Sequence, residues 1–389
     1  MGERRYGLYV HIPFCQARCT YCDFNTVTGM SEEDHRRYVG ALIQELRQEH
    51  PPGAVLTSLY FGGGTPSLID PRLIATIIEA VRGWAPLVDD AWEVTLEVNP
   101  GTATEEALTA WRDAGVNRLS IGAQARQPSH LAALHRVHDV DQIDATFLLA
   151  RTAGFNNLSL DAIYGLPDQT LAEWQETVNG LIALGPDHLS LYALTVERGT
   201  PLQRQLQRGV IKLPHPDLVA DMADWAELRL AAEGLLAYEI SNYAKPGKES
   251  RHNRLYWELE PYLALGAGAH AYVPGRRWWN VRGVRRYVTI VEQGGDPMAG
   301  EEILSLSEEM RQFLWLGLRE RAGVSRERFR ERFGVDVQAA VGEPLADLVA
   351  RGLVEENPEW VRLTARGRDL ANWVGQRLVD APITVRTSE

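Results

Sequence analysis

The chain has 389 residues, more than one small hydrophobic core requires, so we expect two or three packed units. Apolar residues make up 45% and charged residues 24%, and the 34 glycines and 20 prolines are scattered, which excludes a disordered or collagen-like chain. The formal net charge of -12 repels polyanions, so general attraction to nucleic acids or to membrane surfaces is not expected.

The first half of the chain repeats a strand and then a helix roughly every 30 residues, which is typical of parallel βα units. Helices are expected between the strands, one of them beginning at the capping pattern of Ser31 and Asp34 and another at Thr170. Six such units in succession cannot leave a parallel sheet uncovered, so we expect the sheet to curve into an open or closed barrel. In such barrels the chemistry lies at the carboxyl ends of the strands. The strands are expected at residues 7–12, 58–61, 92–98, 118–122, 157–163 and 188–194.

The pattern changes after about residue 200. A long amphipathic helix is expected at 214–236 and a strand at 238–243. Further on, helices at 307–319, 325–333 and 344–351 and a hairpin at 353–363 indicate a winged-helix-like unit. The predicted fold class is α/β, a partial (βα)6 barrel followed by a connecting α+β segment and a winged-helix-like C-terminal domain. The predicted domains are residues 1–235, 236–300 and 301–389.

The three cysteines of the chain, Cys15, Cys19 and Cys22, fall within eight residues, directly after the first expected strand. A disulfide framework would need an even number of cysteines spread over the fold. A structural zinc ion takes four ligands, and His11 is the one near candidate for the fourth. We therefore expect a metal or iron–sulfur site held by three thiolates with one open position, in preference to zinc or to three unrelated buried thiols.

The run from Tyr9 to Cys22, YVHIPFCQARCTYC, has the CxxxCxxC spacing and resembles the radical S-adenosylmethionine (SAM) proteins. In that family three thiolates bind three irons of a 4Fe-4S cluster, and the open iron chelates the amino and carboxylate groups of SAM. The resemblance therefore implies a 4Fe-4S cluster bound by Cys15, Cys19 and Cys22, together with SAM.

Residues at the ends of the other expected strands are candidates for SAM binding. The run FGGGTP (61–66) reads by itself as a tight turn, but beside the cysteine loop its unshielded backbone amides are expected to hold the methionine part of SAM. Any one polar residue at a strand end is commonly an ordinary surface residue, but these positions match SAM-binding residues in the proteins that the chain resembles. The SAM-binding residues implied are Tyr9, Gly63, Gly64, Thr65, Glu97, Gln124, Arg136 and Asp161.

Three later segments indicate which branch of the radical SAM proteins the chain resembles: LDAIYGLPDQT (160–170), YEISNYAKPG (238–247) and RHNRLYW (251–257). They are similar to the HemW-type haem chaperones, and the similarity extends over nearly the whole chain. It implies a protein that binds haem and delivers it to apo-haemoproteins, with respiratory-chain proteins as the expected acceptors. The histidine of the family's HNxxYW motif is implicated in haem binding, so His252 is the expected haem ligand, because neutral imidazole is a common axial ligand. The alternative is that His252 lies in a polar loop as a surface or hydrogen-bonded residue, with Tyr256 and Trp257 in a core.

An oxygen-independent coproporphyrinogen III dehydrogenase is the competing interpretation. Those enzymes carry a further cysteine two positions after the third cluster ligand, where this chain has Phe24, and a long extension before the YVHIPF motif, where eight residues precede Tyr9. A radical enzyme must shield its reactive intermediate from water. Oxidase activity is therefore not expected, while the residues leave open whether SAM is cleaved or only bound.

The location and the partners are inferred from charge and hydropathy. No apolar stretch approaches the ~20 residues of a membrane span, and the amino terminus lacks a signal-peptide pattern, so we expect a cytoplasmic protein without a transmembrane segment. Contact with a membrane surface stays open. Residues 301–389 contain 13 Arg and no Lys against 16 Asp and Glu, a balance of 13 - 16 = -3, so no nucleic-acid partner is expected.

Overall fold

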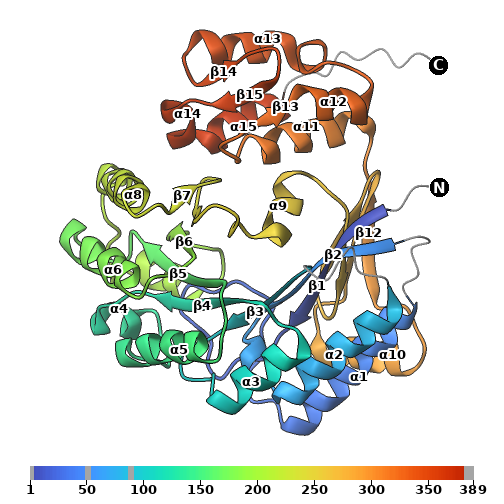
Figure 1. The fold of residues 1–389 in the computed structure, drawn as a ribbon. Coiled ribbons are helices and arrows are strands. Elements are labelled where there is room, and N and C mark those ends of the chain that lie inside the picture. The colour runs from blue at the N-terminus through green and yellow to red at the C-terminus, as the bar shows by residue number, and fades with distance from the viewer. Residues whose placement is uncertain (1–3, 49–53, 86–91, 381–389) are drawn as a thin grey trace.

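The structure, a computed structural model, describes residues 4–48, 54–85 and 92–380 (Figure 1). The ends of the first and last predicted domains, residues 1–3 and 381–389, lie outside the described residues. The strands of the large sheet are β1 (Arg4–Ile12), β2 (Ala54–Gly63), β3 (Glu93–Val98), β4 (Arg118–Gln124), β5 (Leu158–Tyr164), β6 (His188–Ala193), β7 (Leu236–Ala237), β8 (Asn242–Ala244), β9 (Tyr262–Leu265), β10 (His270–Val273), β11 (Arg276–Asn280) and β12 (Met298–Ile303). The small sheet contains β13 (Val324–Ser325), β14 (Val354–Glu356) and β15 (Trp360–Leu363).

The helices are named in chain order. They are α1 (Glu32–Gln48), η1 (Pro66–Leu68, a 3-10 turn), α2 (Pro71–Trp84), α3 (Glu105–Ala114), α4 (Pro128–Ala133), α5 (Val140–Thr152), α6 (Leu171–Ala183), α7 (Pro201–Gln207), α8 (Pro216–Ala231), α9 (Arg251–Trp257), α10 (Val284–Glu292), α11 (Leu306–Gly317), α12 (Arg326–Phe333), α13 (Val337–Ala350), α14 (Ala365–Asp369) and α15 (Ala371–Val379). Among the described helices, none is both long and apolar enough to cross a bilayer.

Strands β1 to β6 pair in parallel in chain order, which confirms the predicted partial barrel. Successive side chains of a strand point to opposite faces, so one face of each strand packs under the surrounding helices and the other faces the barrel interior. The outward face is apolar, as Leu8, Leu59 and Leu96 illustrate, whereas Ser58, Tyr60 and other polar residues alternate with it. The interior of this barrel therefore carries polar side chains.

Residues 236–300 contain both helices and strands, as the predicted connecting α+β segment requires, but most of these elements do not lie where the sequence indicates. The predicted strand at 238–243 is wrong over most of its length, because β7 ends at Ala237 and β8 begins at Asn242. The predicted helix at 214–236 ends early, at Ala231, where Gly234 with a φ of 74° turns the chain away. Strands β9 to β12 were not predicted; β9 pairs in parallel with β1, so this segment extends the barrel sheet.

The C-terminal residues form a unit with a hydrophobic core of its own, which includes Phe313, Phe329 and Leu348. The predicted helix at 344–351 is the second part of α13, which starts at Val337 and bends at Val341, where φ is -134°. Figure 1 shows this unit above the barrel, against α9. The guanidinium of Arg319 lies 4.5 Å from the centroid of the Trp257 ring at the end of α9.

Candidate cofactor site and the HNxxYW helix

The cysteine loop follows β1 and is fixed at two points. At its base, the Cys15 N–H donates to the Val27 carbonyl at 2.9 Å, and the Val27 N–H donates to the Pro13 carbonyl at 2.8 Å. At its far side, the Thr20 hydroxyl donates to the Ala133 carbonyl at 3.1 Å. These bonds tie the loop to itself and to the α4 region, so the three thiols are presented from a fixed backbone.

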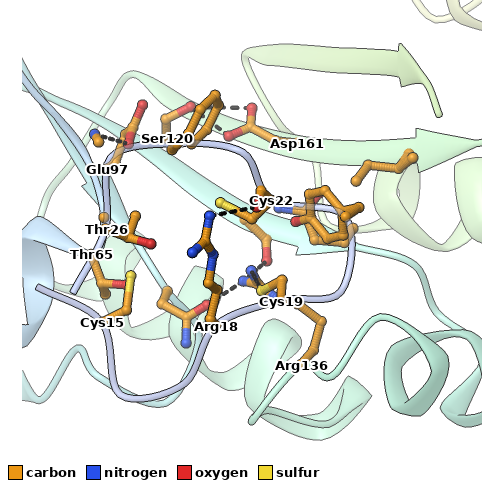
Figure 2. A pocket seen from close by; sticks show the side chains of 18 of the residues that line it. Cys15, Arg18, Cys19, Cys22, Thr26, Thr65, Glu97, Ser120, Arg136 and Asp161 are labelled. Atoms are coloured by element: carbon orange, nitrogen blue, oxygen red, sulfur yellow. Dashed lines mark hydrogen bonds between the residues drawn. The ribbon is translucent and has the colours of Figure 1, made fainter. Parts of the chain in front are cut away.

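The three thiols face the mouth of one cavity from different sides, as Figure 2 shows. The Thr65 hydroxyl lies 3.6 Å from the sulfur of Cys15, and Nη1 of Arg136 lies 3.4 Å from the sulfur of Cys19. Burial raises the pKa of Cys22 to about 11, so an incoming metal must displace a proton there. Among the described His, Cys, Asp and Glu residues, no three converge on a single metal ion. Three thiols that line the mouth of one cavity are a donor set suited to an iron–sulfur cluster, which takes thiolate ligands.

The glycine run at the end of β2 packs against the end of β1. A Cβ on Gly64 would lie 2.7 Å from the carbonyl carbon of Pro13, which leaves no room for a side chain. The backbone amides of this run are already bonded: Gly63 donates to Glu97, Gly64 to the Ile12 carbonyl and Thr65 to the Phe14 carbonyl. These amides are therefore bonded within the protein, while all three residues line the cavity, and their contact with SAM stays a prediction.

Glu97 stands on β3 with its carboxylate inside the barrel. It accepts from the Tyr60 hydroxyl at 2.8 Å and from the Gly63 amide at 3.2 Å. Burial nevertheless raises the pKa of Glu97 to about 7. Tyr9, which was also predicted to bind SAM, is not among the residues that line the cavity. Its hydroxyl lies 3.1 Å from Nδ1 of His11.

The raised pKa of Glu97 predicts a pH dependence of stability. Between about pH 4.5 and 7 the native protein holds a proton on Glu97 that the unfolded chain has lost, so the free energy of unfolding falls as the pH rises through this window. The loss reaches about 3 kcal/mol at most, from 1.36 kcal/mol per pKa unit. In urea unfolding of the cofactor-free protein at pH 5 and pH 8, Glu97→Gln should lose less stability than the wild type. Equal losses in the two proteins would contradict this.

Gln124, Arg136 and Asp161 complete the set of polar residues at the strand ends. Gln124 has a φ of 66° at a bulge in the pairing of β4 with β5, and it lines the cavity. Arg136 donates to Asn99 and, at 3.1 Å, to the Gly122 carbonyl, in addition to its contact with Cys19. Asp161 accepts from the Ser120 hydroxyl at 2.8 Å, and burial raises the pKa of this carboxyl group. The fold thus brings these three residues to the cavity that holds the cysteines. Figure 2 shows Arg136 and Asp161 there.

The cavity has a volume of about 460 Å³ and reaches from the cysteine loop into the barrel. Sequence reasoning missed several of its lining residues, among them Tyr60, Asn99, Arg118, Ser120 and Asn253. Four of them stand on or next to the predicted strands, and the alternation of strand side chains could have identified Tyr60, Arg118 and Ser120 as inward-facing. Asn253 lies on α9, and nothing in its local sequence indicates the cavity.

The HNxxYW motif forms α9, which closes the barrel at the end opposite the cysteines. Glu93, at the start of β3, accepts from the amides of Arg251 and His252, each at 3.0 Å. The Ser250 side chain caps the helix by accepting from the Asn253 amide. The amino-terminal end of α9 is therefore bound to the barrel wall.

His252 is fully buried beneath this helix, with 0% of its surface exposed. Its Nδ1 lies 2.8 Å from the Ser58 hydroxyl, its Nε2 lies 2.8 Å from the Tyr256 hydroxyl, and its ring stacks on Tyr60 with centroids 5.1 Å apart. Burial, and then the charge of Arg118, lowers the pKa of His252 to about 3, so the imidazole is neutral. Both ring nitrogens are in use and no macrocycle can approach them. The prediction that His252 ligates haem iron does not hold in this structure.

Comparison with known proteins gives matches along the whole chain. The model of the radical SAM superfamily matches residues 9–181, and that of the HemN C-terminal domain matches residues 304–370. The heme chaperone HemW of Bacillus subtilis is 36% identical over 371 residues, which are 94% of this chain and 97% of that protein. The chain belongs to the HemW family. Heme chaperone HemW of Mycobacterium tuberculosis is also 36% identical, over 97% of this chain and 96% of its own length.

Among solved structures, coproporphyrinogen III oxidase (HemN) from Escherichia coli, described as a radical SAM enzyme, superimposes with a TM-score of 0.84. It is 25% identical and covers 97% of this chain and 91% of its own. This likeness confirms the predicted fold class, a radical SAM partial barrel with a C-terminal unit. Membership of the radical SAM superfamily implies a 4Fe-4S cluster and SAM as cofactors.

Proposed function

We propose that this protein binds haem in the cytoplasm and delivers it to apo-haemoproteins, with respiratory-chain proteins as acceptors. The observation that carries the proposal is its 36% identity to a heme chaperone HemW over 94% of the chain. Phe24 supports it, because the oxidases that the chain also resembles carry a cysteine at this position. The scaffold retains the cofactor residues, so the proposal includes a 4Fe-4S cluster and SAM.

Cys15, Cys19 and Cys22 would hold the cluster, and Glu97, Gln124, Arg136 and Asp161 would bind SAM beside it. When bound, the reduced cluster supplies an electron that can cleave the sulfonium of SAM. The chain's own contribution is positioning, because Arg136 links the Cys19 sulfur to the strand ends through Asn99 and Gly122. The carboxyl groups of Glu97 and Asp161 are held by hydroxyl donors inside the barrel.

Haem needs a surface other than His252. Beside the cysteines, Phe24 is 62% exposed and Val137 is 48% exposed, and both line the mouth of the cavity. Exposed apolar side chains at a cavity mouth are suited to pack against a flat apolar macrocycle. We therefore assign haem to this mouth.

Anaerobic haem titration of the reconstituted protein tests the proposal. The Soret absorbance should saturate at about one haem per chain, and the loaded protein should convert an added apo-haemoprotein to its holo form. Phe24→Ala should weaken haem binding about tenfold, whereas Leu228→Ala, which removes a still more exposed apolar side chain from α8, should leave it unchanged. Non-saturable binding, or loading without transfer, would reject haem delivery.

The oxidase alternative predicts a different result with the same sample. We expect no protoporphyrinogen IX when the protein is incubated anaerobically with coproporphyrinogen III, SAM and a reductant. The physical reason is Phe24, which leaves the position of the additional cysteine without a thiol. Product formation at a catalytic rate would replace the proposed function by the oxidase.

A further inference from the structure

The floor of the cavity contains a buried arginine for which the assigned cofactor residues give no role. Arg118 is the first residue of β4, points into the barrel and is 1% exposed. Its Nε has no hydrogen-bond partner, and no ion pair joins it to a carboxylate of the described residues. A buried charge without a partner is costly, so such a group normally has a ligand or counterion.

The nearby carboxylates are occupied by other donors. Glu93 accepts from the amides of Arg251 and His252 at the start of α9. Asp161 accepts from the hydroxyls of Ser120 and Ser159. Both carboxylates act on Arg118 by their charge, but no hydrogen bond or ion pair joins either of them to it among the described residues, so the guanidinium keeps donors for a group within the cavity.

Asn253 adds a second donor at the same end of the cavity. It lines the cavity from α9, and its backbone amide, but not its side chain, has a bond among the described residues. The charge of Arg118 lowers the pKa of the neighbouring His252. Glu93, whose charge acts on Arg118, accepts from the His252 amide at the start of α9. A guanidinium and a carboxamide N–H group therefore line the same cavity, and such a pair of donors is suited to carboxylate oxygens.

SAM itself cannot satisfy Arg118 in the orientation that the family implies. SAM carries one carboxylate, and the cluster iron at the cysteine end chelates it. Arg136 contacts the Cys19 sulfur and also donates to the carbonyl of Gly122, so Gly122 lies at the cysteine end of β4. Arg118 precedes Gly122 by four residues of β4, roughly 13 Å at the rise of an extended strand. The carboxylate at the cluster and an anion at Arg118 are therefore different groups.

We propose that Arg118 and Asn253 form a subsite for a carboxylate carried by a second ligand, which enters the cavity below SAM. The subsite goes beyond haem delivery, because it concerns the anionic group that the barrel accepts rather than the macrocycle at the mouth. Two sources supply this chemistry, a small carboxylic acid and a propionate arm of haem.

The test uses propionate and its neutral amide as probes of the anaerobically reconstituted protein, with binding measured by saturation-transfer NMR. Propionate should bind and propionamide should not. Arg118→Gln should weaken propionate binding at least tenfold and removes no bond that the structure shows. Asn253→Asp should weaken propionate binding similarly while Arg118 is kept, because the new carboxylate competes with propionate for the guanidinium. Arg198→Gln, on an exposed loop residue, is the matched control and should bind as the wild type does.

Competition then identifies the ligand. Saturating SAM should leave propionate bound; full displacement by SAM would mean that Arg118 holds the carboxylate of SAM, which would overturn the subsite. If haem displaces the bound propionate, the natural ligand of the subsite is a haem propionate. If propionate stays bound in the presence of haem, the natural ligand is a smaller carboxylic acid. Wild-type affinity in both folded variants, Arg118→Gln and Asn253→Asp, or equal binding of the amide, would also overturn the subsite. Haem binding itself is read separately from the Soret band, so failure of the subsite and failure of haem delivery are distinguishable.

Discussion

Cys19→Ala should lose the iron–sulfur cluster. The anaerobically reconstituted wild type should contain about four irons per chain, and the variant close to none, because two thiolates and an open edge do not retain a cube that normally has three protein ligands. Iron and sulfide analysis, together with the absorbance near 400 nm, measure the loss. The effect is expected to be large, because the chain has no other cysteine that could take over.

Gln16→Ala is the matched control for this experiment. Gln16 is an exposed residue on the same loop between the first two cysteines, so the variant perturbs the loop but removes no thiol. It should retain the full iron content. Zinc at one ion per chain with no iron in the wild type, or a Cys19→Ala protein that keeps four irons, would refute the assignment.

His252→Ala should destabilise the protein by about 3 kcal/mol, and the folded variant should still bind haem. The substitution leaves the Ser58 and Tyr256 hydroxyls without their buried partner, and each unsatisfied group costs about 1–3 kcal/mol. It also opens a cavity beneath Tyr60. Urea unfolding measures the stability, and the haem titration described above measures binding.

His270→Ala is the control, because His270 is an exposed residue of β10 that stacks on Trp279. It should change the stability by less than about 1 kcal/mol. Loss of haem binding in a His252→Ala protein whose unfolding curve matches that of the wild type would restore His252 as a ligand. Such a result would require α9 to leave the barrel when haem binds.

The HNxxYW motif connects the barrel interior to the C-terminal unit. His252 and Asn253 face the barrel, whereas Trp257 at the other end of α9 packs under Arg319 of the C-terminal unit. Arg254 of the same helix pairs with Glu320 at 3.3 Å. One short helix therefore contacts both cores, which gives the motif a structural role that its sequence does not disclose.

The local sequence pattern was sufficient to predict those features that depend on neighbouring residues in the chain. The spacing of Cys15, Cys19 and Cys22 indicated one site, and the alternation and punctuation of the first 200 residues placed six parallel strands close to their observed positions. Strands β9 to β12 escaped prediction because they are four to six residues long and some are strongly polar, as RRWWN in β11 is. They are stabilised by pairing with β1 and with one another, which a local pattern does not contain.

The sequence by itself determined the family, the parallel barrel and the grouping of three thiols, because each can be read from short motifs or from a pattern that repeats along the chain. The tertiary structure decided which polar residues share the cavity and which are enclosed. The sequence offered His252 as a haem ligand or as a hydrogen-bonded residue and gave no sign of Arg118. The structure shows both ring nitrogens of His252 bonded within the protein, whereas Nε of Arg118 has no hydrogen-bond partner among the described residues. The pairing of a buried polar group is set by residues far apart in the sequence, such as Ser58 and His252, and only the folded chain brings them together.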